Sequence, residues 1–294
     1  MTETPVQPSL SHRIRTRKQL RIGVIRVISY LLLISGALIV LVPFLWLLRS
    51  SFMTTGQIFI FPPQWIPRPL TWENYLGAFT SVPFFRYFLN TMTIEIGVLL
   101  GVLSSGSIAA YSFARLRWRG RNVVFGAILS TLMMPYVATL IPTFEFWVRV
   151  HAVNTYIPLI VPAWFGGGAF TIFLLRQFLM TIPRELDEAA FMDGATPLQV
   201  YWYVILPLSK TAMIVVGLFT FVGVWGDFLN PLVYLSNQSL YTLAVGLSEF
   251  VSSYSSQWGY MMAASTAVAV PLIVLFFFLQ RHFIEGISIT GIKG

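Results

Sequence analysis

Residues 182–197 read Ile-Pro-Arg-Glu-Leu-Asp-Glu-Ala-Ala-Phe-Met-Asp-Gly-Ala-Thr-Pro, and residues 205–208 read Ile-Leu-Pro-Leu. Four of the eleven carboxylates of the chain fall between Glu185 and Asp193, although long apolar stretches lie on both sides. A polar segment rich in small residues at such a place indicates a specific contact outside the membrane. The sequence therefore predicts that a partner binds this segment. The alternative is a stabilised loop that has no partner.

The composition is that of a membrane protein. Of the 294 residues, 56% are hydrophobic and 10% are charged, and the mean hydropathy is +0.74. A soluble domain carries about 25% charged residues, so this chain could not cover a soluble surface. The absence of cysteine excludes disulfides and thiolate sites.

Six apolar stretches are long enough to cross the roughly 30 Å of hydrocarbon, which takes about 20 helical residues. The sequence therefore predicts an all-α integral membrane protein with six transmembrane helices. Their expected ranges are 27–48, 87–113, 122–144, 152–175, 211–235 and 259–280.

Basic residues are distributed unevenly around these stretches. Fifteen lie in the N-terminal segment, in the loops after the second and fourth stretches, and in the C-terminal segment, whereas four lie in the other loops. Cytoplasmic loops carry the lysine and arginine excess. We therefore expect a basic cytoplasmic tail at 1–23 near lipid headgroups, a six-span domain at 24–280, and a cytoplasmic tail at 281–294. The net charge of +8 thus reflects topology and does not indicate nucleic acid.

Local signals predict a cytoplasmic helical hairpin at 181–208. Pro183 suits the first turn of a helix, and Gly194 can adopt the left-handed conformation that ends one. Thr196 followed by Pro197 is typical of the start of a second helix. Pro207 would then kink or break that helix before the next span.

Two carboxylates fall inside predicted spans, where ionisable groups are costly and usually face a cavity or a partner. Glu95 either pairs with a buried donor or lies near the headgroups. Asp227 follows Trp225 and precedes Asn230; it either faces the transport path or lies where the span ends. We take Glu95, Trp225, Asp227 and Asn230 as candidate residues of a substrate path.

The hairpin also carries a family motif. The pattern Glu188-Ala189-Ala190-x-x-Asp193-Gly194-Ala195, with Pro207 downstream, resembles the EAA loop of binding-protein-dependent ABC importer permeases. Residues 109–121, 241–246 and 280–294 resemble the carbohydrate branch of that family, and the C-terminal segment resembles its MalG-like subunit. Gly226 departs from the pattern, because family members often have asparagine there.

This resemblance implies the type I ABC importer permease fold in the inner membrane of a prokaryotic cell. It implies that the chain forms half of a translocation path for a carbohydrate, together with a second, MalF-like permease. It further implies a homodimeric ATPase that binds the EAA loop, and an extracytoplasmic solute-binding protein. Glu188, Ala189, Ala190, Asp193, Gly194, Ala195 and Pro207 would couple the permease to the ATPase.

Other functions find less support in the sequence. It contains no phosphate-binding loop motif and no His-Glu-x-x-His motif, so we expect no enzyme activity, cofactor or metal, and place ATP on the separate ATPase. The alternative function is an ion-coupled secondary transporter that uses Glu95 or Asp227. Such a transporter would not need the acidic hairpin.

Overall fold

A computed structural model describes residues 10–251 and 257–291, and describes side chains for 22–251 and 257–280. This part of the chain is built of helices and contains no β-sheet. The α-helices are α1 (Leu10–Ser51), α2 (Thr55–Ile58), α3 (Glu73–Ser81), α4 (Phe84–Ala114), α5 (Arg121–Ser130), α6 (Tyr136–Arg149), α7 (Ile157–Ile160), α8 (Ala169–Leu179), α9 (Glu185–Met192), α10 (Pro197–Val200), α11 (Leu206–Leu208), α12 (Lys210–Trp225), α13 (Leu229–Tyr234), α14 (Leu243–Ser248) and α15 (Trp258–Gly291). Short 3-10 turns lie at Thr131–Met133, Val161–Trp164 and Gln238–Leu240, and a π-helix lies at Tyr201–Ile205.

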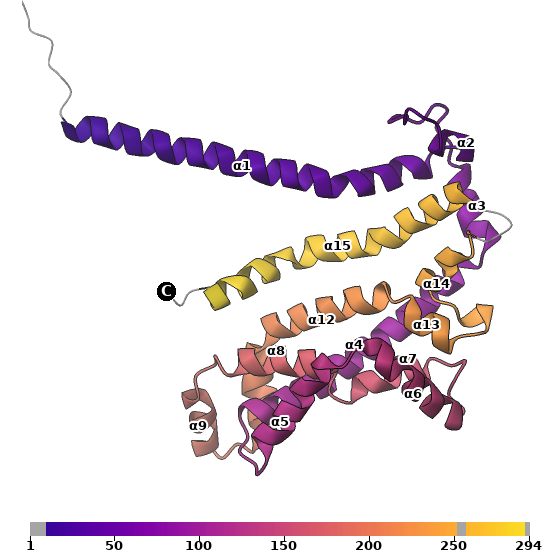
Figure 1. The fold of residues 1–294 in the computed structure, drawn as a ribbon. Coiled ribbons are helices and arrows are strands. Elements are labelled where there is room, and N and C mark those ends of the chain that lie inside the picture. Colours follow the sequence, from indigo (N-terminus) through magenta and orange to yellow (C-terminus); the bar gives the residue numbers. More distant parts are fainter. Residues whose placement is uncertain (1–9, 252–256, 292–294) are drawn as a thin grey trace, which may run out of the picture.

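Four segments are long and apolar enough to cross a membrane individually, namely Ile22–Ser51, Phe84–Ala114, Ile157–Leu179 and Trp258–Gln280. They correspond to four of the six predicted spans. The described start of α1, the described end of α15 and helix α9 lie on the same side of the molecule (Figure 1). Residues 1–9 and 292–294 of the two predicted tails lie outside the described residues, and the rest of both tails is helical and continues the adjacent spans.

The span at Ile157–Leu179 is interrupted at residues 165–168, between the turn Val161–Trp164 and α8. The other two predicted spans are pairs of helices joined at a sharp bend. The stretch expected at 122–144 is broken between α5 and α6, whose axes differ by 104°. The break falls at Met134, which is extended (φ −78°, ψ 122°). The following Pro135 explains it, because proline disfavours helical backbone in the residue before it. The pair therefore counts as one span only if the bent helices are taken together.

The structure also differs from the predicted span at 211–235. Helix α12 begins at Lys210 after a 76° bend from the segment Pro197–Leu208, and it ends at Trp225, ten residues earlier than predicted. The bend lies at Ser209, two residues after Pro207, so the predicted break is present but displaced. A separate short helix, α13, follows the end of α12.

Helix α4 lies at the centre of the packed helices and contacts α8, α12 and the turn Val161–Trp164. Small residues permit this close packing: a Cβ on Gly101 would lie 2.6 Å from Cδ1 of Trp164. The Trp164 indole donates to the carbonyl oxygen of Gly97 at 3.1 Å. A core of buried residues runs along the same helix, from Ile94 to Ala114. Helix α4 is therefore the element to which most of the spans are attached.

Helix α1 is largely uncovered. It packs against α15 (Figure 1), and most of the side chains along its apolar stretch are exposed, including Leu32 and Ile39. An apolar helix of this length with an exposed surface needs lipid or another membrane protein around it.

Candidate functional site

The hairpin at 181–208 has the local structure that its sequence predicts, with shifted boundaries. The first helix, α9, begins at Glu185, two residues after Pro183, and ends at Met192. Gly194 then takes a left-handed conformation (φ 81°), which a residue with a side chain would adopt only at a cost. Thr196 caps the second helix: its hydroxyl accepts from the Gln199 amide at 3.3 Å, and the Gln199 side chain accepts from the Thr196 amide at 2.7 Å.

A buried ion pair attaches the hairpin to the end of α4. Arg115 Nε lies 3.4 Å from Asp187 Oδ2, and the two side chains are 3% and 11% exposed. The same guanidinium donates from Nη2 to the carbonyl oxygen of Ile182 at 2.8 Å. Burial raises the pKa of Asp187, and the guanidinium groups of Arg115 and Arg184 counteract this effect. The charged form of Asp187 is therefore tolerated at this buried position because Arg115 faces it.

Two further hydrogen bonds join the second half of the hairpin to α4. The Tyr111 hydroxyl donates to the carbonyl oxygen of Pro197 at 2.9 Å, and the Ser107 and Tyr201 hydroxyls are 2.8 Å apart. The rings of Tyr111 and Tyr201 pack together at 5.3 Å between centroids. The hairpin is thus attached along the last two turns of one long helix, not suspended between two flexible linkers.

The residues of the predicted coupling motif fall into two groups. Glu188, Ala189, Asp193, Gly194 and Pro207 are exposed. Ala190 and Ala195 are half-buried and pack against the core that includes Tyr111 and Tyr201. The two inward alanines therefore position the hairpin within this chain, and the exposed residues remain available to another protein.

Large apolar side chains, which the sequence argument did not include, also lie on the exposed surface of the hairpin. Met192 is 88% exposed and Tyr203 is 79% exposed. Leu186, Phe191, Leu198 and Trp202 are exposed as well. An exposed apolar surface of this kind marks an interaction site. The sequence did contain a signal for this surface, because these large apolar side chains fall in a segment outside the apolar spans.

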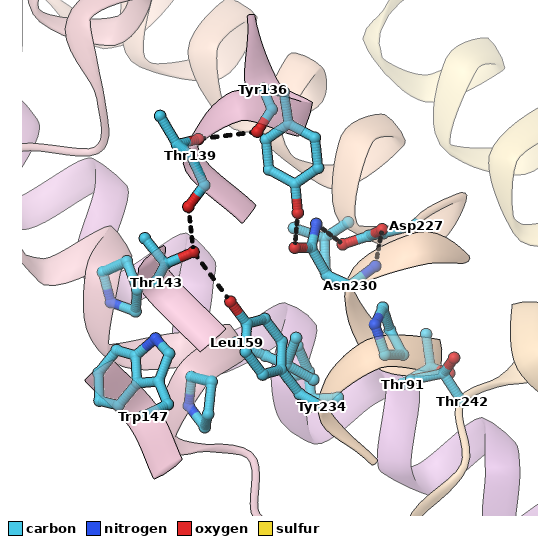
Figure 2. A pocket seen from close by; sticks show the side chains of 15 residues that line it. Thr91, Tyr136, Thr139, Thr143, Trp147, Leu159, Asp227, Asn230, Tyr234 and Thr242 are labelled. Atoms are coloured by element: carbon cyan, nitrogen blue, oxygen red, sulfur yellow. Dashed lines mark hydrogen bonds between the residues drawn. The ribbon is translucent and has the colours of Figure 1, made fainter. Parts of the chain in front are cut away.

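A second candidate site is a cavity of about 290 Å³ beside the N-terminal half of α4. Figure 2 shows its lining, in which side chains of α6 and α13 face each other across the space. The cavity is lined by Thr91, Ile94, Tyr136, Thr139, Thr143, Trp147, Pro158, Leu159, Pro162, Val224, Asp227, Asn230, Pro231, Tyr234 and Thr242. Asp227 and Asn230 were predicted as path residues, whereas the aromatic and threonine residues of α6 were not.

Hydrogen bonds connect the polar side of this cavity. The two oxygens of Asp227 accept from the backbone amide of Asn230 at 3.1 Å and from its side-chain amide at 2.8 Å. The Tyr136 hydroxyl donates to Oδ1 of Asn230 (Figure 2). The Tyr234 hydroxyl donates to Thr143 Oγ1 at 3.3 Å. Asp227 lies two residues after Trp225, the last residue of α12, and is half-buried, so it lies close to the end of a helix and also faces a cavity.

The other two predicted path residues lie outside the cavity lining. Trp225 is 2% exposed, stacks on Phe221 and donates from its indole nitrogen to the carbonyl oxygen of Val268 at 3.0 Å. Glu95 is 1% exposed, and neither carboxylate oxygen has a hydrogen-bond partner among the described residues. Within the described part of the chain, Glu95 is therefore a buried carboxylate without a hydrogen-bond donor.

The described residues contain no group of three or more histidine, aspartate or glutamate side chains that could hold a metal ion.

Comparison with known proteins identifies the family. Residues 97–289 match the family described as the binding-protein-dependent transport system inner membrane component. The chain belongs to this family. The match covers about two thirds of the chain and includes the hairpin and all of the cavity lining except Thr91 and Ile94. The expected relationship to ABC importer permeases is thereby confirmed, and the alternative of an ion-coupled secondary transporter loses its support.

Relatives of the permease extend the match over nearly its whole length. An arabinooligosaccharides transport system permease of Halalkalibacterium halodurans is 32% identical over 278 residues, covering 91% of this chain and 98% of the relative. A diacetylchitobiose uptake system permease of Streptomyces coelicolor is 32% identical over 263 residues, covering 89% and 87%. In a solved structure, a chain of a bacterial ABC transporter for the acidic polysaccharide alginate has the same fold (TM-score 0.78, 23% identity, 95% and 100% covered).

Replacing Arg115 by alanine should loosen the hairpin of the permease. The substitution leaves the carboxylate of Asp187 buried without its partner, which costs about 3–5 kcal/mol in buried pairs. At the lower end of that range, amide hydrogen exchange in α9 should accelerate roughly a hundredfold, since 1.4 kcal/mol is a factor of ten. Hydrogen exchange followed by mass spectrometry measures this directly.

The matched control is Arg149→Ala. Arg149 forms an ion pair with Glu145 at 2.5 Å, but both side chains are more than half exposed. Exposed pairs contribute little to stability, so exchange in α9 should be unchanged. Equal exchange in α9 for both variants would contradict the anchoring role of Arg115.

Replacing Glu95 by glutamine should leave thermal stability undiminished. A buried carboxylate without a partner is costly, and glutamine has the same shape without the charge. The midpoint of thermal unfolding of the purified permease, compared with that of an exposed control, Glu145→Gln, tests this. A lower midpoint for Glu95→Gln alone would show that the carboxylate has a favourable partner.

Proposed function

We propose that this chain is one of two permease subunits of an ATP-driven importer of carbohydrate, and that the hairpin at 181–208 couples it to a separate ATPase. The observation that carries the proposal is structural: a buried ion pair attaches an exposed hairpin to α4, and the same helix lines a cavity with one polar and one apolar side. The family supplies the transport class. The names of the two relatives, permeases for arabinooligosaccharides and diacetylchitobiose, support a saccharide as the substrate.

The partners follow from this proposal. A homodimeric ATPase would bind the exposed residues of the hairpin, including Glu188, Ala189 and Asp193. A second, MalF-like permease would complete the translocation path, and an extracytoplasmic solute-binding protein would deliver the saccharide. Both termini and the hairpin would lie on the cytoplasmic side of the prokaryotic inner membrane, in agreement with the distribution of arginine and lysine.

Packing supports a rigid connection between the two sites. Ile94 lines the cavity, and Tyr111 holds the hairpin. Both residues belong to one α-helix, so they are about 26 Å apart along its axis at 1.5 Å per residue. Packed helices shift between discrete arrangements and do not deform continuously. A displacement of the hairpin by the ATPase would therefore move α4 and with it one wall of the cavity.

A bulky residue on the exposed hairpin surface should prevent assembly with the ATPase. Ala189 is exposed and is not among the described residues that pack against the core around α4, so Ala189→Trp should leave the fold of the permease intact. We expect loss of the ATPase from the affinity-purified complex and loss of ATP-dependent uptake. The measurement is the yield of ATPase that copurifies with the tagged permease in detergent.

The control for this prediction is Thr80→Trp, which adds the same side chain at an exposed position of α3, far from the hairpin. It should retain the ATPase at the level of the unmodified chain. Normal copurification and uptake with Ala189→Trp would contradict the proposed docking of the hairpin.

A further inference from the structure

The cavity beside α4 has one polar side and one apolar side. Tyr136, Thr139 and Thr143 of α6, with Asp227 and Asn230, place oxygen and nitrogen atoms around it. Ile94, Leu159, Trp147 and three prolines are among the residues that form its apolar side. Its volume of about 290 Å³ is at the lower end of the roughly 300–1,000 Å³ typical of small-molecule sites. The combination suits a small solute that has both hydroxyl groups and apolar ring faces.

The charge of the cavity is defined by one side chain. Among the described residues that line it, Asp227 is the only carboxylate, and none is lysine, arginine or histidine. Within the described part of the chain Asp227 forms no ion pair, and the hydrogen bonds of its carboxylate are those with Asn230. An anion entering the cavity would therefore meet a carboxylate with no cation beside it, and like charges at short range repel.

The hydrogen bonds leave acceptor capacity free. Each oxygen of Asp227 accepts one hydrogen bond from Asn230, and an ionised carboxylate oxygen can accept two. The Tyr136 hydroxyl donates its hydrogen to Asn230, so its oxygen can still accept hydrogen bonds. The network is thus held in place by Tyr136 and Asn230 and presents acceptor atoms. Hydroxyl hydrogens of a sugar are the donors that such atoms bind.

From these features we infer that the cavity is a binding subsite for one residue of an uncharged saccharide, and that Asp227 selects against anionic saccharides such as uronates. Asp227 accepts hydrogen bonds from sugar hydroxyls. The aromatic side chains of Trp147 and Tyr234 contact the ring faces, which are apolar. The inference rests on the proposed transport function and adds the charge class of the substrate to it.

The chain has no cysteine, so a single introduced thiol reports on the cavity. Thr139→Cys places a thiol on the cavity wall. In the assembled importer in nanodiscs, the rate of its modification by a methanethiosulfonate reagent is measured alone and with increasing concentrations of three probes. The probes are arabinobiose and N,N′-diacetylchitobiose, which are uncharged, and an alginate disaccharide, which is anionic.

We expect both uncharged probes to slow the modification and the alginate disaccharide to need at least about tenfold higher concentration for the same protection, as one like-charge contact implies. Asp227→Asn should remove this difference between the probes. Glu145→Gln, which removes a carboxylate from α6 outside the cavity, should preserve the difference. A Thr80→Cys thiol, exposed on α3, should be protected by none of the probes.

The outcomes separate the inference from the proposed function. Equal protection of the Thr139→Cys thiol by the anionic and uncharged probes, with Asp227 in place, overturns the charge selection. Absence of protection by both uncharged probes, in a complex that performs ATP-driven uptake of a saccharide, overturns the subsite while the proposed function stands. Absence of any ATP-driven, binding-protein-dependent uptake overturns the proposed function itself.

Discussion

The ion pair between Arg115 and Asp187 is the contact on which the arrangement of the hairpin depends. Both side chains are buried at the junction of α4 and α9, where a lone charge would be strongly disfavoured. The pair therefore constrains geometry more than it adds stability: if α9 moves away from α4, each charge loses its partner. The hydrogen bonds of Tyr111 and Ser107 extend the same attachment to the second half of the hairpin.

This constraint gives α4 two functions in one rigid element. Its C-terminal turns hold the hairpin, and its N-terminal half contributes Thr91 and Ile94 to the cavity. Glycines along the helix allow neighbouring side chains to contact its backbone, as Trp164 does at Gly97. The exposed apolar residues of the hairpin, with Glu188 and Asp193, then remain free for a partner. The structure thereby joins an external contact surface to a solute-sized cavity without a flexible segment between them.

Four of the spans and the turn of the hairpin could be predicted from local sequence, because the interactions that form them are local. Four spans follow from apolar length, and the turn of the hairpin follows from Gly194 and Thr196. Pro135 indicated a break at Met134, but the prediction of one continuous span at 122–144 relied on the length of the apolar stretch. The pairing of Arg115 with Asp187 and of Tyr136 with Asn230 could not be predicted, because these contacts join residues 72 and 94 positions apart. A residue type alone does not show which distant partner it meets.

The central claim, that the hairpin and α4 move as one body, is tested most directly by a distance across the junction. Met192 and Leu100 are exposed, and the chain has no native cysteine. Spin labels attached at Met192→Cys and Leu100→Cys therefore report this distance by double electron–electron resonance spectroscopy in the assembled importer. The account predicts the same distance distribution without nucleotide and with a non-hydrolysable ATP analogue, and a broadened distribution when Arg115→Ala is added. A distance that shifts by several ångströms on nucleotide binding in the otherwise unmodified chain would contradict it.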